Sequence, residues 1–347
     1  MGPTDVLQVL ALPDLAAKIA GHLDARSWLS FAQSCQTVRS AFRSSACIQQ
    51  ISLGSNDSGD VPLDSILSYM PLPGPACVEL KSASVDFSRA LSVAPHCEVL
   101  RVSSLLPIVD DSIIPAETLL QLNISSVTST LLLRCRALRD LEVDSISPEI
   151  ASSCPRLSTL TVRNPMTPSA VVDLLKVLPN LQRMTVMLKA DEGRNRLHSC
   201  VTCSDEEPLF QHKSLRELFL TVGSGVSDIE ALLISCSVSL QHLGIKADEA
   251  ACAPQFGLCQ LSWLRSLRLE MPLTMEILED VLESLPLDKL EIPEDITEAP
   301  RRGELRVLSS TDLAQMAAIV LPPGHVRPVQ KPTAICPACE VPPPPKE

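Results

Sequence analysis

One apolar pattern recurs at near-constant spacing along most of this sequence, and it constrains the fold more than any other feature. Two successive copies lie nineteen residues apart: Cys135, Leu138, Leu141 and Val143, then Cys154, Leu157, Leu160 and Val162. The last two apolar residues of each copy flank a single residue, and such alternation is typical of a short β-strand with one buried face. A fixed period predicts strands that lie side by side, with the rest of each repeat returning the chain to the next strand.

Nine copies of the pattern align in phase, mostly at intervals of 19–25 residues. The first leucine-type position falls at Cys97, Leu119, Leu138, Leu157, Leu181, Leu215, Leu240, Leu264 and Leu287. The strand pairs are Leu100/Val102, Leu122/Ile124, Leu141/Val143, Leu160/Val162, Met184/Val186, Leu218/Leu220, Leu243/Ile245, Leu267/Leu269 and Leu290/Ile292. An upstream match at Ile48, Ile51 and Leu53 predicts a capping strand.

The pattern resembles the strand motif of the leucine-rich-repeat family, L-x-x-L-x-L with a period of about 20–29 residues. This resemblance implies an α/β solenoid with parallel β-strands on its concave face and helices or turns on its convex face. The family has Asn or Cys three residues after the last strand position, where this chain has Leu105, Val127, Ile146, Pro165 and Lys189.

Several return segments carry helix-start signals. Thr167 followed by Pro168 combines an N-cap residue with proline at the first helical position. Ser227 with Glu230 matches a capping box, and apolar residues at helical spacing follow Thr274. We expect helices to begin at these three places.

Composition narrows the possible partners and compartments. The 347 residues carry a formal net charge of −12, which disfavours a nucleic-acid or anionic-membrane partner. The thirteen cysteines are scattered, and we interpret them as reduced thiols of an intracellular protein, cytoplasmic or nuclear. The short apolar segment 6–12 lacks the features of a signal peptide, and no apolar run reaches the length of a membrane span.

Residues 12–46 do not follow the repeat and predict three short helices, the first with Leu15, Ile19 and Leu23 on one face. The segment resembles an F-box, a family that opens with Leu-Pro and continues with a spaced Ile and Leu, an Asp-Pro-Arg-like turn and a small apolar run ending in Cys. The matching residues are Leu12, Pro13, Ile19, Leu23, Asp24, Ala25, Arg26, Leu29, Phe31, Ala32 and Cys35. The family often has Trp in the third helix, where this chain has Val38.

The F-box resemblance implies a substrate-receptor subunit of an SCF-type (cullin–RING) ubiquitin ligase, with no catalytic group of its own. The residues that would bind the Skp-type adaptor, and through it a cullin, are Leu12, Pro13, Leu15, Ile19, Leu23, Leu29 and Phe42. The repeats would then bind a target protein for ubiquitin-dependent degradation. The alternative is a leucine-rich-repeat scaffold or inhibitor without a ligase role, in which residues 12–46 only cap the first repeat.

These patterns divide the chain into three parts. Residues 10–50 form the F-box-like helical domain, residues 51–320 form the repeat solenoid, and residues 321–347 form a Pro-rich tail that we expect to be disordered or extended. The interval from Leu181 to Leu215 is 34 residues, so this repeat carries a polar insertion.

The insertion raises the hypothesis of a zinc site. It contains His198, Cys200, Cys203 and His212, and the C-x-x-C spacing lets two thiolates bind one tetrahedral zinc ion. An acidic loop with incidental cysteines explains the same residues, because no second C-x-x-C lies nearby. We favour that interpretation, and we expect neither a metal nor another cofactor.

The residues that flank each strand pair point to the concave face and form the candidate substrate-binding surface. We select an acidic group, two arginines on the following strands, one exposed aromatic residue and three later polar positions. These residues are Asp140, Glu142, Asp144, Arg163, Arg183, Phe219, His242, Lys246 and Arg268.

Overall fold

The computed structural model describes 30, 50–53, 77–80, 96–102, 114, 116–190, 210–223, 226, 229–247, 258–271, 275–293 and 305–320. The chain divides into two compact units, Met1–Met187 and Leu188–Glu347. The adaptor-binding residues predicted between Leu12 and Phe42 lie outside the described residues. So do most of the polar insertion and all of the Pro-rich tail, and the predicted boundaries at 50 and 320 stay predictions.

The first unit is built on strands that lie side by side in the order of the sequence. They are β1 (Gln50–Leu53), β2 (Cys77–Leu80), β3 (Val99–Val102), β4 (Gln121–Asn123), β5 (Asp140–Val143), β6 (Thr159–Met166) and β7 (Arg183–Leu188), of which only the last residue of β7 belongs to the second unit. Neighbouring strands from β1 to β6 are parallel. Their register places Leu122 beside Leu141 and Leu141 beside Leu160, so equivalent positions of successive repeats are neighbours in space.

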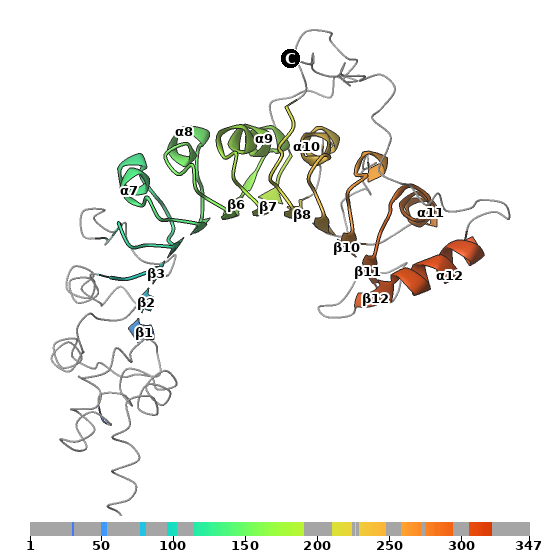
Figure 1. The fold of residues 1–347 in the computed structure, drawn as a ribbon, viewed down its shortest axis with the longest axis horizontal. Helices are drawn as coiled ribbons and strands as arrows, with labels where there is room; N and C mark the ends of the chain where they lie inside the picture. The colour runs from blue at the N-terminus through green and yellow to red at the C-terminus, as the bar shows by residue number, and fades with distance from the viewer. Residues whose placement is uncertain are drawn as a thin grey trace, which may run out of the picture. The chain divides into compact units, whose positions relative to one another are not determined.

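Short helices return the chain between these strands. They are α7 (Ser129–Arg134), α8 (Pro148–Ala151) and α9 (Pro168–Val177), and all three lie on the same side of β4 to β6 (Figure 1). The N-cap side chains of Thr128, Ser147 and Thr167 each accept a hydrogen bond from the N–H three residues later. Such a bond satisfies one of the backbone donors that a helix start leaves unpaired. The predicted start of a helix at Thr167 and Pro168 is confirmed.

The second unit repeats this arrangement with β8 (Glu217–Val222), β9 (His242–Ala247), β10 (Ser266–Glu270), β11 (Lys289–Pro293) and β12 (Leu305–Ser309). Its helices are α10 (Glu230–Cys236), the 3-10 turn η2 (Leu258–Gln260), α11 (Met275–Ser284) and α12 (Ser310–Val320). Both α10 and α11 lie on one side of the strands (Figure 1). The predicted helix after Thr274 is confirmed.

Two features of the second unit correct the sequence-based expectations. Strand β12 runs antiparallel to β11, whereas β8 to β11 are parallel to one another. Parallel neighbours need a crossover connection between them, whereas antiparallel neighbours do not. Helix α10 has Ile229 at its N-cap and no side-chain cap, so the predicted capping box is wrong.

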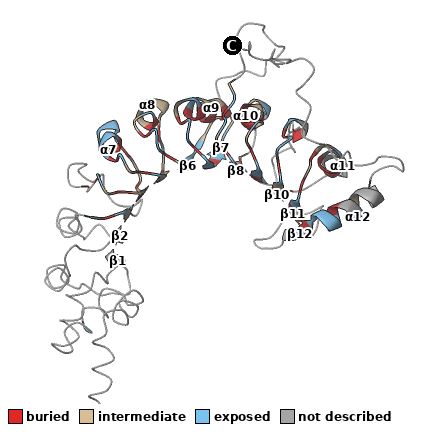
Figure 2. Cartoon of the chain, viewed as in Figure 1, coloured by how far each residue is buried: buried red, intermediate tan, exposed pale blue. Residues whose placement is uncertain are grey.

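The core of each unit is an aliphatic ladder between the strands and the helices (Figure 2). Every residue of the nine predicted strand pairs is buried, and so is every first leucine-type position. The cysteines at or before these frames, Cys97, Cys135, Cys154 and Cys236, are buried thiols. Burying one Leu or Ile side chain contributes roughly 1.5–3 kcal/mol, so repetition of a single layer accounts for much of the stability of each unit.

Each unit therefore has the leucine-rich-repeat architecture that the sequence predicts. Val127 and Ile146 occupy the family's Asn position and are buried, so apolar contacts replace polar ones at these two turns. Within the described parts of the chain, no helix combines the length and the apolar character needed to cross a bilayer.

Candidate protein-binding face

Residues that alternate with the buried ladder point away from the helices and form the open sheet face of each unit. The first-unit face contains Gln121, Asn123, Asp140, Glu142, Asp144, Thr161, Arg163, Arg183 and Met187. The second-unit face contains Glu217, Phe219, His242, Gly244, Lys246, Arg268, Glu270, Lys289 and Glu291. All nine residues predicted from the sequence to bind a substrate lie on these two faces and are exposed or partly exposed.

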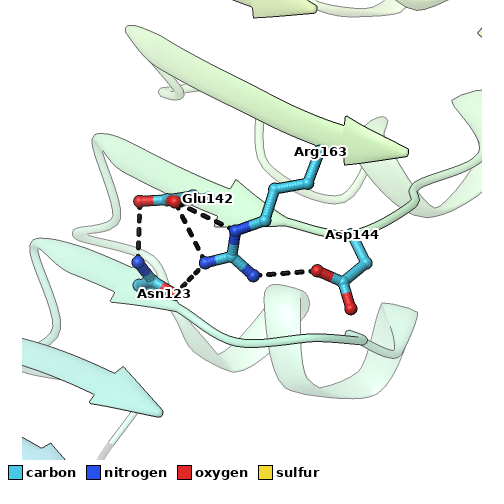
Figure 3. Close-up of polar contacts among 4 residues, drawn as sticks. All are labelled: Asn123, Glu142, Asp144 and Arg163. Carbon is cyan, nitrogen blue, oxygen red and sulfur yellow. Dashed lines mark hydrogen bonds and ion pairs between the residues drawn. The ribbon is translucent and has the colours of Figure 1, made fainter. Parts of the chain in front are cut away.

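The centre of the first-unit face is a polar cluster around Arg163 on β6 (Figure 3). Arg163 Nη1 donates a hydrogen bond of 2.8 Å to Asp144 Oδ1, and Nε donates one of 3.0 Å to Glu142 Oε1. Arg163 Nη2 also forms an ion pair with Glu142 and donates a hydrogen bond to Asn123 Oδ1. The guanidinium fork of one arginine therefore joins three adjacent repeats.

Two amide side chains on β4 complete this cluster. Asn123 Nδ2 donates a 2.7 Å hydrogen bond to Glu142 Oε2, and Gln121 Nε2 donates one of 2.9 Å to Asp140 Oδ2. The register explains these contacts, because Asn123 lies beside Glu142 and Gln121 lies beside Asp140. Neither amide was among the residues predicted to bind a substrate, although both hold the frame positions of the selected acids one repeat earlier.

The charges of the cluster are partly compensated. Burial opposes the charge of Arg163, but hydrogen bonds to Asp144 and Glu142 outweigh this effect and raise the pKa of the guanidinium. One cation and three carboxylates, those of Asp140, Glu142 and Asp144, leave a formal charge of −2. The sequence indicated an acidic group followed by separate arginines, and the structure joins Arg163 to that group. Arg183 lies one strand further, on β7, and is exposed.

The second-unit face is organised in rows that cross the strands. The middle row contains Phe219, Gly244, Arg268 and Glu291, which are register partners on β8 to β11. Val307 on β12 is the register partner of Glu291 and extends this row with a second exposed apolar side chain.

His242 lies in the adjacent row, where its register partners are Glu217 and Ser266. Aromatic, cationic and anionic groups are therefore neighbours on one surface.

The ring of Phe219 lies over Gly244. A methyl group placed on the Gly244 Cα would come within 2.5 Å of Phe219 Cδ1 and 3.1 Å of Cε1. Gly244 is itself buried although it lies on the open face, because the ring covers it. Phe219 retains 37% of its exposure, so one side of the ring is seated on the strand while part of it faces solvent.

The charges of this face form two layers. Lys246, Arg268 and Lys289 keep side-chain exposures of 49%, 47% and 48%, whereas Glu270 and Glu291 keep only 23% and 15%. Arg268 Nε donates a 2.6 Å hydrogen bond to Glu270 Oε1, and its Nη1 lies 3.5 Å from Glu291 Oε2. The Nζ atoms of Lys246 and Lys289 lie 3.6 Å from Glu270 and 2.5 Å from Glu291. The carboxylates thus form an inner layer that holds the three cations at the surface.

His212, one of the four candidate zinc ligands, lies in the core instead. Its Nδ1 accepts hydrogen bonds from the backbone N–H groups of Leu215 at 3.0 Å and Ser214 at 3.3 Å, so this lone pair is not available to a metal. The other three candidates lie outside the described residues. Among those that are described, no three His, Cys, Asp or Glu side chains are grouped in a way that could hold a metal ion.

Comparisons with known proteins found structures with a similar fold but no protein with a similar sequence. No protein-family model matches the chain, and no curated protein is similar to it in sequence. Its fold is similar to that of an internalin, InlF, from Listeria monocytogenes, with 15% identity, a TM-score of 0.41, and coverage of 81% of this chain and 91% of the internalin. A chain of the Drosophila Toll–Spatzle complex matches with 13% identity and a TM-score of 0.34. That match covers 64% of this chain, which spans only about a quarter (26%) of the other protein. The leucine-rich-repeat assignment rests on the strand order and the buried ladders described above.

Proposed function

We propose that this protein is a non-catalytic substrate receptor of an SCF-type ubiquitin ligase. Its N-terminal segment would bind a Skp-type adaptor, and through it a cullin, while its open sheet faces bind a target protein. The observation that carries the binding role is the second-unit face. There an exposed Phe219 ring lies in the same cross-strand row as Arg268, which is two strands away. Aromatic residues and arginines are the side chains that dominate protein interfaces.

The ligase role is supported by the order of residues in the N-terminal segment. Leu12, Pro13, Ile19 and Leu23 match the F-box pattern, and the repeats follow. A receptor of this kind acts by proximity, because a bound target is held near the charged ubiquitin-conjugating enzyme and its effective concentration rises. Such a role would place the protein in the cytoplasm or the nucleus.

Adaptor capture by the full-length chain tests the ligase role. We expect a purified Skp-type adaptor to be retained by the wild-type protein. Ile19→Asp or Leu23→Asp should weaken this binding by roughly a hundredfold or more, because each change buries a charge in an apolar contact. Leu133→Asp is the matched control, since Leu133 is an exposed apolar residue on α7, and it should leave retention unchanged.

A second candidate function is a leucine-rich-repeat scaffold or inhibitor without a ligase role. Val38 at the place where the F-box family often has Trp favours this candidate. Failure of the intact chain to retain any adaptor would exclude the ligase role, and the sheet faces would remain as the binding surface of a scaffold.

A further inference from the structure

The charged groups of the second-unit face sum to zero, but the most exposed of them are cations. Three cations, Lys246, Arg268 and Lys289, and three carboxylates, Glu217, Glu270 and Glu291, sum to zero, with His242 counted as neutral. A ligand nevertheless meets the cations first, because Glu270 and Glu291 are the more covered groups. Glu217 lies at the start of β8 beside His242, in the row adjacent to that of Arg268.

The cations retain hydrogen-bonding capacity for a ligand. The five N–H donors of an arginine are spread over three nitrogens. In Arg268 each of these nitrogens faces Glu270 or Glu291, so the second hydrogen on each Nη can still be donated outward. A lysine ammonium has three donors. Lys246 and Lys289 each direct theirs to one carboxylate partner on the neighbouring or the same strand, which leaves further donors at the surface.

The apolar part of this surface is held in a fixed place. Phe219 lies over Gly244, and Arg268 is the next residue of the same row. With strands about 4.8 Å apart, the row from β8 to β11 spans roughly 14 Å, which an extended peptide of about four or five residues covers. An apolar anchor therefore lies one, two and three strand spacings from the outward cationic groups of Lys246, Arg268 and Lys289.

We propose that the second-unit face binds an acidic peptide segment of the target protein, with one apolar side chain of that segment packed on the Phe219 ring and its carboxylates bound by Lys246, Arg268 and Lys289. This inference rests on the proposed substrate-receptor function and names the class of target. Carboxylates match the outer layer of charge, and the ring supplies an interface anchor.

Fluorescence anisotropy with the full-length protein tests this proposal. The probe is a labelled octapeptide of Glu and Ser with one central Leu. The comparison peptides replace Glu by Lys, or Leu by Gly. We expect the acidic Leu peptide to bind at least tenfold more tightly than either comparison peptide. Absence of binding up to about 1 mM, or equal binding of the Lys peptide, would overturn the proposal.

Substitutions then locate the site. Lys246→Gln, Arg268→Gln and Lys289→Gln combined should weaken binding roughly tenfold or more, since each exposed charge pair contributes modestly. The matched control is Arg136→Gln, Arg156→Gln and Lys176→Gln, which removes three exposed cations of the first unit. Equal loss in both triple variants would show a non-specific charge effect and reject the site.

A second variant tests the anchor without changing any charge. Gly244→Ala must displace the Phe219 ring. We expect it to weaken binding of the Leu peptide by roughly fivefold or more while leaving the weak binding of the Gly peptide unchanged. Unchanged binding of the Leu peptide would reject the role of the ring.

Adaptor retention is measured on the same preparations, so the two proposals can fail separately. If the protein retains the adaptor but does not bind the acidic peptide, the proposed ligase role stands and the proposed acidic target is rejected. A chain that binds the peptide but not the adaptor keeps this site as that of a scaffold. Preferential binding of a single-stranded oligonucleotide over the acidic peptide would replace the proposed partner and overturn the inference.

Discussion

Arg163 on β6 donates a 2.8 Å hydrogen bond to Asp144, the residue that holds the same frame position nineteen residues earlier. The same guanidinium also contacts Glu142 and Asn123, so one side chain connects β4, β5 and β6 (Figure 3). Bidentate contacts between arginine and carboxylates are stronger than single ion pairs, because their geometry is fixed. This cluster therefore stabilises the packing of successive repeats, and it reduces the negative charge presented by the first-unit face.

Arg163→Met should lower the free energy of unfolding by about 1–2 kcal/mol. The substitution keeps the aliphatic stem but leaves the carboxylates of Glu142 and Asp144 close together without their cation. The loss should shrink as salt concentration rises, since both carboxylates are partly exposed. Urea denaturation at low and high ionic strength measures this effect.

The control for this prediction is Arg156→Met, because Arg156 is an exposed arginine in the turn before β6. It should change the free energy of unfolding by no more than about 0.5 kcal/mol. A double-mutant cycle with Glu142→Gln isolates the pair, and a coupling energy indistinguishable from zero would contradict the role given to Arg163.

His212→Ala should destabilise the second unit by about 1–3 kcal/mol. Only 2% of His212 is exposed, and its Nδ1 accepts the N–H groups of Ser214 and Leu215 just before β8. Removing the acceptor leaves two backbone donors without a partner, one of them in the core. The carbonyl oxygen of Asn can replace Nδ1 as an acceptor, so His212→Asn should recover part of the loss in a thermal or urea denaturation.

The exposed His242 provides the comparison for His212. Its replacement by Ala should change stability by no more than about 0.5 kcal/mol. If the two histidine variants were equally stable, the buried hydrogen bonds of His212 would not matter for folding. A chelator separates the structural role from metal binding, because it should leave the stability of the wild-type protein unchanged if His212 acts only through its hydrogen bonds.

The buried ladders could be predicted from the sequence because their burial depends only on spacing. Leu141 and Val143 alternate with Glu142, and equivalent residues recur at near-constant intervals, so a parallel stack buries one whole set. The contact between Asp144 and Arg163 was also open to prediction, because both residues occupy the same frame position in successive repeats. The fold and the identity of the exposed face followed from this single periodicity.

Other features depend on geometry that the period does not contain. From the sequence, Gly244 is only a residue that weakens a strand. The structure gives the reason for it, because the Phe219 ring on the neighbouring strand lies over Gly244 and leaves no room for a Cβ. The direction of β12 depends on the connection that follows Pro293, where the repeat pattern has ended. The position of His212 in the core could not be distinguished from a metal-binding role, because a histidine near two cysteines has the same sequence signature in both cases.

Thr167→Ala should lower the free energy of unfolding by about 1 kcal/mol. The Thr167 hydroxyl accepts a 3.3 Å hydrogen bond from Ala170 N–H at the start of α9, and its loss leaves a helix-start donor without a partner. Thr167→Ser keeps the hydroxyl and should retain most of the stability, which urea denaturation can measure. Equal losses in the Ala and Ser variants would point to the lost methyl group instead of the cap.

The buried thiols should resist alkylation until the chain unfolds. Burial raises the pKa of Cys97 and Cys236 to about 12 and that of Cys154 to about 11, from an ordinary value of about 9. The thiolate is the reactive form, so at pH 8 these residues should react with iodoacetamide only in denaturant. Peptide mass spectrometry can assign the modified residues, and modification of Cys236 in the native protein at the rate seen in denaturant would contradict its burial.

The raised pKa values of these three thiols also determine how the free energy of unfolding changes with pH in the alkaline range. The unfolded state loses each thiol proton near pH 9, whereas the folded state keeps it until pH 11 or 12. Between these values the folded state binds more protons, so stability falls as pH rises, by about 1.4 kcal/mol per pH unit for each thiol. Below pH 9 this contribution is fully present. Cys236→Ala removes one titrating group, so its stability should fall less steeply than that of the wild type between pH 9 and pH 11. Parallel pH profiles for the two proteins would show that the Cys236 thiol ionises equally in both states.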